Sequence, residues 1–291
     1  MSPARDPNLI RIALPKGRMY DEIVALLKGA GISIGNSARG YRPAISLSNF
    51  DAKILKPRNV ISMLVAGARD VGFAGADWLD EMGVELHEII DTRLNPVQLV
   101  VAAPVELLED GELPKRHLVI ASEYPNMAQR WIESRGIDAE VLTTYGATEV
   151  FPPEDADLII DNTATGSTLR ANGLQIIDEI MKSSTRLYAS KEAMQNPEIK
   201  TQLEDLGLLL DAVLRARGRV MMDLNVASDK LEAVLAVLPS MRQPTISSLS
   251  TDGWHSVRSA VERSDLADVI PKLKAAGACD IVTTSAEQLI P

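Results

Sequence analysis

The sequence predicts an α/β fold in two parts, and three observations support it. Up to about residue 160, short apolar runs typical of buried strands alternate with segments whose apolar residues recur at helical spacing. Residues 191–217 then show a continuous helical pattern. Beyond residue 217 the order changes to strand, helix, strand, strand, helix, strand, which is the βαββαβ order of a ferredoxin-like unit.

The first part opens with an apolar strand over residues 9–14, followed by a turn. Ile23, Leu26, Leu27 and Ala30 then recur at positions i, i+3, i+4 and i+7 and predict an amphipathic helix. Further patterns predict a helix around 60–64, strands over 70–75, 97–103 and 117–121, a helix over 126–134, and strands over 141–144 and 158–160. Two sheets built from such units leave a cleft between them, a common place for small-molecule sites.

The last part of the chain has apolar stripes of its own. Strands are expected over 219–226, 245–249, 254–261 and 279–284, and helices over 231–238 and 266–273. We therefore divide the chain into a first lobe of residues 1–96 plus 186–217, a second lobe of residues 97–185, and a tail domain of residues 218–291.

Composition and charge exclude several classes of protein. The 291 residues carry a net charge of −10, so we expect no nucleic-acid partner, and an anion site must be a local basic island. Cys279 is the single cysteine, which excludes an intrachain disulfide, and His87, His117 and His255 are too scattered for a zinc site. The first ten residues lack the apolar core of a signal peptide, and no apolar run is long enough to span a membrane. We expect a cytoplasmic protein without a resident metal.

The strongest local motif covers residues 161–169 and follows the apolar strand at 158–160. Asp161 places a carboxylate at the end of that strand, where α/β folds bind ligands. The turn Thr165-Gly166-Ser167-Thr168 adds hydroxyls and closely spaced backbone N–H groups that can hold a phosphate. A carboxylate beside a phosphate site suits a sugar phosphate. The alternative is an ordinary capped helix start after a buried strand.

Basic residues gather in two other segments of this acidic chain. Lys16 and Arg18 flank a glycine after the first strand, in a pattern that suits a triphosphate or pyrophosphate. A denser cluster follows, consisting of Arg39, Arg42, Lys53, Lys56 and Arg58. From the residues alone, a solvated surface turn explains the first segment as well as an anion site does. Scattered surface charge explains the second segment slightly better than a site does.

A glycine-rich segment at 72–77 predicts a flat loop that could accept the face of a purine. Close packing between a strand and a helix explains such glycines equally often. No Ser/His/Asp triad stands out, which fits a reaction governed by positioning and charge stabilisation.

Taken together, these segments resemble the ATP phosphoribosyltransferase family in its long, histidine-regulated form. The likeness lies in residues 13–18, 70–77, 121–126, 146–150 and 161–174, and in residues 231–234, 244–246 and 252–254 of the tail. Asp161, Thr165, Gly166, Thr168 and Leu169 match the family's signature for phosphoribosyl pyrophosphate (PRPP).

Two positions depart from the family pattern. Asn162 stands where an aliphatic residue is usual, directly beside the ligand signature. Lys56 stands where an arginine is expected, which removes a bidentate fork, and Arg58 is the candidate to compensate.

The resemblance implies a catalytic core like a periplasmic binding protein, with two lobes around a cleft, followed by a regulatory tail domain. It implies that adenine N1 of ATP displaces pyrophosphate from PRPP, with Mg²⁺ carried by PRPP, at the start of histidine biosynthesis. It also implies inhibition by histidine and assembly of a homo-oligomer, from dimer to hexamer.

On this basis we assign roles to individual residues. The catalytic cations are Lys16, Arg18, Arg39, Lys56 and Arg58. The PRPP-binding residues are Glu149, Asp161, Thr165, Gly166, Ser167, Thr168 and Leu169. The nucleotide-binding residues are Gly72, Ala74, Gly75 and Asp77. The candidate histidine-binding residues are Asp223, Thr245, Ser247 and Ser248.

Two other functions compete with this interpretation. A two-lobed ligand-binding or sensor protein without catalysis would have the same fold, but would not need both a phosphate turn and several cations. Another phosphoribosyltransferase, acting on a smaller base, is the second.

Overall fold

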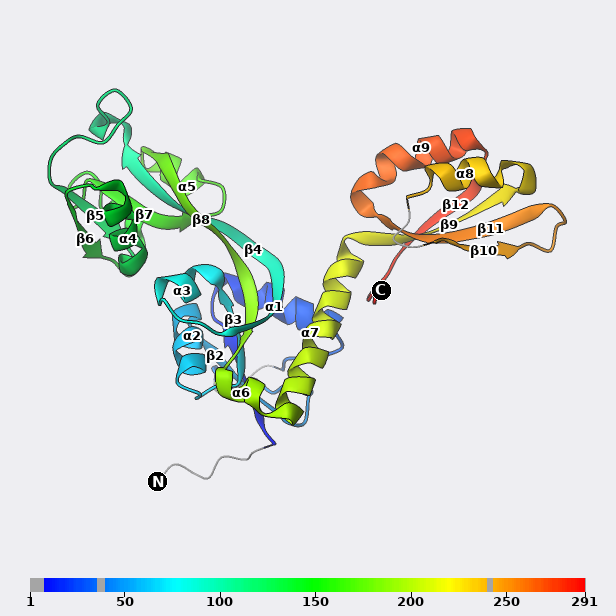
Figure 1. Ribbon diagram of the computed structural model, residues 1–291, viewed down its shortest axis with the longest axis horizontal. Helices are drawn as coiled ribbons and strands as arrows, with labels where there is room; N and C mark the ends of the chain where they lie inside the picture. The colour runs from blue at the N-terminus through cyan, green and yellow to red at the C-terminus, as the bar shows by residue number, and fades with distance from the viewer. Residues whose placement is uncertain (1–7, 36–39, 240–242, 291) are drawn as a thin grey trace. The chain divides into compact units, whose positions relative to one another are not determined.

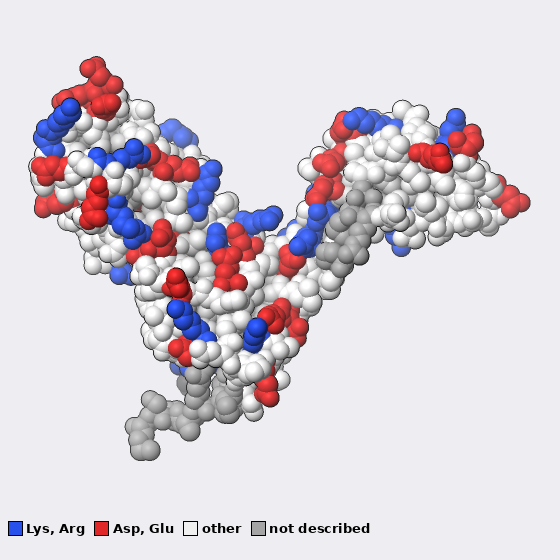
Figure 2. Space-filling model, viewed as in Figure 1, with Lys and Arg blue, Asp and Glu red and all other residues white. Residues whose placement is uncertain are grey.

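The computed structural model describes residues 8–35, 40–239 and 243–290, which form two compact units. The first unit contains the described residues up to Val24 and Ser33–Glu204, and the second contains Ala25–Ile32 and the described residues from Asp205 onward. Among the described residues, no helix is both long and apolar enough to cross a membrane. On the face drawn in Figure 2, the described acidic and basic side chains are interspersed.

An eight-stranded sheet forms the centre of the first unit, in the order β2-β1-β3-β8-β4-β7-β5-β6 (Figure 1). Its strands are β1 Ile10–Pro15, β2 Phe50–Leu55, β3 Val71–Gly75, β4 His87–Pro104, β5 Leu118–Ser122, β6 Ala139–Thr143, β7 Leu158–Thr163 and β8 Leu174–Ala189. The helices of this unit are α2 Pro57–Val65, α3 Ala76–Glu81, α4 Pro125–Arg135, α5 Ser167–Ala171 and α6 Lys191–Gln195. The helices α1 Arg18–Gly29 and α7 Pro197–Arg217 contribute residues to both units.

Local sequence explains how two of these helices begin. Pro57 and Pro125 start α2 and α4, at a position where a helix loses nothing by the missing N–H. The buried carboxylate of Glu81 on α3 accepts hydrogen bonds from the backbone N–H groups of Asn126 (3.1 Å) and Met127 (2.9 Å) at the start of α4. This contact ties the two halves of the first unit together beside the sheet.

The long strands β4 and β8 lie side by side through the middle of the sheet (Figure 1). β8 also pairs with β3, and β4 also pairs with β7, so the two strands join the half containing β1–β3 to the half containing β5–β7. Where β4 passes from one half of the sheet to the other, its register against β8 shifts on both sides of Leu94. The neighbouring Arg93 and Asn95 have φ values of 57° and 47°.

The second unit has the βαββαβ order. Its elements are β9 Arg219–Ala227, α8 Leu231–Val237, β10 Thr245–Ser248, β11 Trp254–Glu262, α9 Leu266–Ala276 and β12 Cys279–Ser285. The strands form an antiparallel sheet in the order β10-β11-β9-β12, and both helices lie on one face of it (Figure 1). Every second residue of β9 is buried, so the other face of β9 carries no helix of this unit.

The predicted fold class is confirmed: a mixed α/β core is followed by a ferredoxin-like βαββαβ unit. The two separate sheets expected of the core are instead one sheet, because β4 and β8 pair and join the two halves. The sequence patterns missed β2, α3, β8 and the first half of β4. β8 and the first half of β4 were missed because they carry many polar residues. Their register shifts also interrupt the alternation of buried and exposed residues that marks a strand. The boundaries 1–96, 97–185, 186–217 and 218–291 stay predictions.

Candidate active site

Parallel strands bring two basic segments of the first unit together. β1 and β2 pair in parallel and in register from Ile10↔Phe50 to Pro15↔Leu55, so both strands end at the same edge of the sheet. The backbone N–H of Lys16 donates to the carbonyl oxygen of Leu55 at 2.7 Å. Lys16 and Lys56, which are 40 positions apart in the sequence, therefore leave adjacent strand ends.

The other half of the sheet repeats this arrangement with acidic and polar residues. β5 pairs in parallel with β6 and with β7, and Ser122 is opposite both Thr143 and Ile160. Glu123, Thr144 and Asp161 each follow one of these three residues. The strand ends of this half therefore carry hydroxyl and carboxylate groups at one edge.

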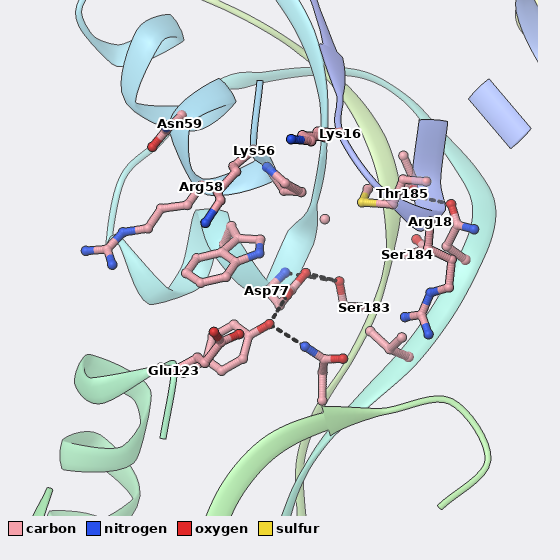
Figure 3. A pocket seen from close by; sticks show the side chains of 18 of the residues that line it. Lys16, Arg18, Lys56, Arg58, Asn59, Asp77, Glu123, Ser183, Ser184 and Thr185 are labelled. Atoms are coloured by element: carbon pink, nitrogen blue, oxygen red, sulfur yellow. Dashed lines mark hydrogen bonds between the residues drawn. The ribbon is translucent and has the colours of Figure 1, made fainter. Parts of the chain in front are cut away.

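A cavity of about 740 Å³ lies between these two sets of strand ends. Figure 3 shows Lys16, Lys56 and Arg58 on one side of it, and Arg18, Ser184 and Thr185 on the opposite side. The cavity is also lined by Met19, Pro57, Asn59, Gly75, Asp77, Trp78, Asn95, Val97, Glu123, Tyr124, Thr144, Tyr145, Asn162 and Ser183. A cavity of this size is large enough for a nucleotide.

Two aromatic rings form part of the wall of this large cavity. The centroids of Trp78 and Tyr124 are 4.7 Å apart, with the ring planes tilted by 30°. The guanidinium of Arg58 lies 5.9 Å from the centroid of the Trp78 ring. Trp78 is only half-buried, so part of its flat surface is open to a ligand, and a cation beside an aromatic face suits a base that carries phosphates.

Asp77 forms a buried polar contact at the bottom of the large cavity. Its carboxylate accepts hydrogen bonds from Ser183 Oγ and from Tyr124 Oη, both at 2.7 Å (Figure 3). The backbone N–H of Asp77 donates to Ser183 Oγ at 3.1 Å. Burial and the charge of Asp77 raise the pKa of Tyr124 far above its usual range, so Tyr124 stays protonated.

A second cavity of about 200 Å³ adjoins the first and is built on the segment after β7. It shares Arg18 and Asn162 with the large cavity, so the two cavities meet at these residues. The remaining lining residues are Glu149, Asp161, Thr163, Ala164, Thr165, Ser167, Thr168 and Leu169. Glu149 comes from a short 3₁₀ helix, Thr148–Val150.

Asp161 is the acid with the most altered titration in this small cavity. Burial raises the pKa of Asp161 to about 6, and the charges of Glu123 and Glu149 act in the same direction. Hydrogen bonds from the Asn162 backbone and the Thr148 side chain oppose this rise. Burial also raises the pKa of Glu123, while Lys56 lowers it.

The turn at 163–168 is held by its own polar groups. Gly166 has a φ of 70°, and its N–H donates to Thr163 Oγ1 at 2.9 Å. The hydroxyls of Thr165 and Ser167 are 2.9 Å apart, and Arg170 donates to the carbonyl oxygen of Thr165 at 3.1 Å. These contacts fix the turn and leave threonine and serine side chains along the small cavity.

Comparison with known proteins identifies the family of this site. The family model for ATP phosphoribosyltransferase matches residues 56–210, and the model "HisG, C-terminal domain" matches residues 216–288. The ATP phosphoribosyltransferase of Pelotomaculum thermopropionicum is 35% identical over 97% of this chain and 99% of its own length. The chain belongs to the ATP phosphoribosyltransferase family.

Further matches agree with this assignment. The ATP phosphoribosyltransferase of Solibacter usitatus is 36% identical over 94% of this chain and 96% of its own length. The solved ATP phosphoribosyl transferase (HisG:HisZ) complex from Thermotoga maritima matches with a TM-score of 0.62 and 28% identity, over 70% of this chain and 99% of that chain. The predicted pentosyltransferase of the long form is thus confirmed, and a binding protein without catalysis is not favoured.

The structure brings together most of the basic residues that the sequence selected in this ATP phosphoribosyltransferase. Lys16, Arg18, Lys56 and Arg58 all line the large cavity. Arg39 lies outside the described residues. Arg42 and Lys53 are not among the lining residues, and an Arg42 guanidinium nitrogen lies 4.0 Å from a carboxylate oxygen of Asp51.

The glycine-rich segment at 72–77 partly lines the cavity and partly serves close packing of a strand against a helix. Gly75 and Asp77 line the large cavity, whereas Gly72 and Ala74 lie buried inside β3. A Cβ at Gly72 would lie only 2.6 Å from Val60 Cγ1, so close packing between β3 and α2 explains this glycine. The predicted flat loop at 72–77 is wrong, because its first four residues belong to β3 and its last two start α3.

The predicted PRPP residues also gather, with one exception. All of them line the small cavity except Gly166, which lines a neighbouring surface pocket with Arg170 and Ile176. The Gly166 N–H already donates to Thr163 Oγ1, so the structure uses this N–H within the turn itself. Leu169 is buried and anchors α5 to the core.

Sequence reasoning missed several residues of the large cavity, namely Trp78, Asn95, Tyr124 and the hydroxyl run 183–185. The last carries a visible signal, since Ser183-Ser184-Thr185 is an uninterrupted hydroxyl run within a strand. Trp78 directly follows Asp77, and Tyr124 lies within the family-like segment 121–126, so position along the chain offered a signal for both. Asn95 has no such neighbour.

In the second unit, the four candidate histidine-binding residues do not share one face. Thr245 pairs with Arg258 and Arg258 with Asp223, so Thr245, Asp223 and, two positions along, Ser247 face away from the helices. Ser248 pairs with His255, and His255 pairs with the buried Val226, so Ser248 faces the helix side. Arg258 Nε donates to Asp223 at 2.6 Å.

Proposed function

We propose that the large cavity binds ATP and the small cavity binds the ribose 5-phosphate part of PRPP. The observation that carries this assignment is that Arg18 and Asn162 line both cavities. Two ligands bound in these cavities would meet at that boundary, as a transfer between two polyanionic substrates requires. Holding both reactants in line supplies much of the rate, because no strong base is needed.

In the reaction, the lone pair of adenine N1 forms a bond to the anomeric carbon of the ribose. The bond from that carbon to pyrophosphate breaks, and its electron pair leaves with the pyrophosphate. Positive charge develops on the ribose ring, as in other glycosyl transfers. The ionised Asp161, with Glu149 beside it, accepts hydrogen bonds from the ribose hydroxyls and stabilises that charge.

The basic residues and the aromatic wall orient the substrates. Lys16, Lys56 and Arg58 neutralise the polyphosphates, while Arg18 lies where the pyrophosphate leaves. The half-buried Trp78 provides a face for stacking of the adenine ring. Mg²⁺ enters as part of the PRPP substrate, and its charge offsets that of the pyrophosphate.

A direct assay tests this function. Purified full-length protein is mixed with ATP, PRPP and Mg²⁺, and pyrophosphate release is followed together with the near-ultraviolet absorbance of the adduct. We expect release of one pyrophosphate per adduct, inversion at the anomeric carbon, and strong loss of turnover in Asp161→Asn. Turnover of a free small base in place of ATP would instead support a different phosphoribosyltransferase.

Regulation by histidine is proposed for the helix-free face of the second unit. Asp223, Thr245 and Ser247 provide polar groups on that face. The edge strand β10 can pair with another subunit, which would build a homo-oligomer up to a hexamer. We place this assembly in the cytoplasm. A thermal-shift measurement of the full chain should show stabilisation by histidine. The stabilisation should be lost in Asp223→Ala and kept in Ser248→Ala. Equal loss in both variants would refute the proposal that histidine binds the helix-free face.

A further inference from the structure

A chain of hydrogen bonds leads from the large cavity to the small one. It starts with Ser183 and Tyr124 donating to the two carboxylate oxygens of Asp77. Asn162 Nδ2 donates to Tyr124 Oη at 2.7 Å (Figure 3). The backbone N–H of Asn162 donates to Asp161 Oδ1, also at 2.7 Å. Asn162 thus contacts the bottom of one cavity with its side chain and the acid of the other with its backbone.

The donors and acceptors allow only one direction along this chain. The carboxylate of Asp77 can only accept, and Tyr124 uses its single hydroxyl hydrogen to reach it. Tyr124 must therefore accept from Asn162, and this fixes which end of the Asn162 amide faces the tyrosine. Asp77 and Tyr124 are both buried, with 5% and 1% of their surfaces exposed, so water competes little for these bonds.

The four elements that supply the chain come from different parts of the first unit. Asp77 lies on α3 and Ser183 on β8, whereas Tyr124 follows β5 and Asn162 lies on β7. A ligand that moves α3 or Tyr124 in the large cavity therefore moves the amide of Asn162. Since the Asn162 backbone N–H supports Asp161, the displacement reaches the acid that faces the ribose.

We propose that Asn162 is a positioning residue that couples the two substrate cavities, through its side-chain contact with Tyr124 and its backbone contact with Asp161. The inference rests on the proposed function for the identity of the two ligands. Coupling between two ligands is reciprocal, so a nucleotide in the large cavity changes the affinity for PRPP by the same factor as PRPP changes the affinity for the nucleotide. Without the amide of Asn162, each cavity binds its ligand independently.

The pH dependence of PRPP use provides a second signature. Asp161 faces Glu123 and Glu149, which raise its pKa, and Arg18 lines the same cavity, while the Asn162 N–H stabilises the ionised form. When loss of the side-chain contact with Tyr124 shifts Asn162 within β7, the bond from its N–H to Asp161 weakens and the pKa of Asp161 rises further. The acidic limb of kcat/KM for PRPP then moves to higher pH.

Full-length Asn162→Leu is the decisive variant, because leucine has nearly the shape of asparagine but cannot donate. PRPP affinity is measured by calorimetry with and without 1-deaza-ATP, an ATP analogue that lacks the attacking nitrogen. In the unmodified protein we expect the analogue to change PRPP affinity at least about fivefold, within the usual range for coupled sites. In Asn162→Leu this factor should fall to about one, and the acidic limb should move to higher pH.

Two comparisons separate coupling from simple destabilisation. Tyr124→Phe should have the same effect as Asn162→Leu, and the double variant should behave like either single variant. Asn172→Leu removes a similar amide contact, to the Thr168 carbonyl oxygen, outside the chain of bonds and should keep the coupling factor. Where Tyr124→Phe does not fold, Asn162→Leu and its pH profile decide the question.

The possible results distinguish this inference from the proposed function. An unmodified protein that does not consume ATP and PRPP would refute the proposed function itself. An active protein in which Asn162→Leu keeps both the coupling factor and the pH profile would overturn only the role of Asn162. Additive effects of Tyr124→Phe and Asn162→Leu would also overturn it, because independent residues do not form one chain.

Discussion

The two cavities of the first unit offer anions different kinds of contact. The large cavity presents four cations, all of them exposed side chains on flexible stems: Lys16, Arg18, Lys56 and Arg58. Among the described residues that line the small cavity, Arg18 is the single cation, and the rest of the site is a turn with hydroxyls beside acids. The large cavity attracts anions by long-range charge, whereas anion binding in the small cavity depends on the shape of its backbone turn.

This difference predicts different tolerance to substitution. Exposed cations interact with a ligand through water of high dielectric constant, and several of them contribute to its binding. The loss of one therefore lowers the affinity only modestly. A turn that is fixed by a positive φ and by internal hydrogen bonds has no such redundancy. Substitutions in the small cavity should therefore have larger effects than substitutions among the cations of the large one.

The largest effect is expected for Gly166→Val. A β-branched residue does not adopt a φ of 70° without strain, and its Cβ would lie 3.0 Å from Arg170 Nη1. Since Arg170 and Thr163 hold the turn, the turn should change shape and PRPP binding should be lost in calorimetry, while ATP still binds.

Gly111→Val is the matched control for this variant. Gly111 has a φ of 87°, and a Cβ added there would have no neighbouring atom within 4 Å, so valine would be similarly strained at a residue that lines neither cavity. It should lower the melting temperature without changing PRPP affinity. If Gly166→Val binds PRPP as well as Gly111→Val does, the turn at 163–168 is not part of the PRPP site.

The next largest effect is expected for Asp161→Asn. Loss of a charge-assisted hydrogen bond costs roughly 1.5–3 kcal/mol, or about 10- to 150-fold in PRPP affinity. The loss should be measurable at pH 8 and should shrink below pH 6, because the pKa of Asp161 is about 6 and the unmodified acid is then neutral. ATP affinity should change far less, and an equal loss for both ligands would indicate a structural carboxylate.

The same substitution should have the opposite effect on folding. The pKa of Asp161 is raised to about 6 from an ordinary value of 3.8, so the folded protein binds this proton more tightly than the unfolded chain. Stability from this group is present at low pH and is lost as pH rises from about 4 to about 6. Asp161→Asn should thus stabilise the protein at pH 8, on the order of 3 kcal/mol, and have little effect at pH 4.

Denaturant unfolding of both proteins at the two pH values measures this effect. The control is Asp138→Asn, whose exposed carboxylate lies 2.9 Å from the exposed His117. It should show no comparable gain at pH 8. A destabilised Asp161→Asn at pH 8 would mean that the ionised carboxylate is needed for folding.

The small cavity was largely predictable from sequence because all its lining residues except Arg18 and Glu149 come from one continuous segment. Residues 161–169 supply an acid, a turn and hydroxyls in order, and their spacing alone brings them together. What the sequence could not give was the orientation of Gly166, because the bond from its N–H to Thr163 depends on the exact turn geometry.

The large cavity shows where sequence reasoning is limited. Lys16 and Lys56 meet because β1 and β2 run parallel and end together, yet β2 itself was not predicted. Trp78, Asn95 and Tyr124 come from three separate segments, and only the sheet order brings them into one wall. The hydroxyl run at 183–185 lies in β8, whose pairing with β4 depends on residues about 90 positions away.

The smallest effect is expected for substitutions at Lys56. Its exposed ammonium contributes charge without a fixed geometry, so Lys56→Ala should lower ATP affinity only about two- to fivefold, or ~0.5–1 kcal/mol. Lys56→Arg should restore the affinity, because arginine keeps the charge and adds a planar fork for phosphate oxygens. Lys53→Ala removes the same charge from β2 outside the cavity and should have no effect. Calorimetry at low and high ionic strength is the test, since salt screens an exposed charge and the loss in Lys56→Ala should then shrink. A loss as large as that of Asp161→Asn, or one that salt does not reduce, would show that Lys56 makes a specific, shielded contact and that the contrast between the two cavities is wrong.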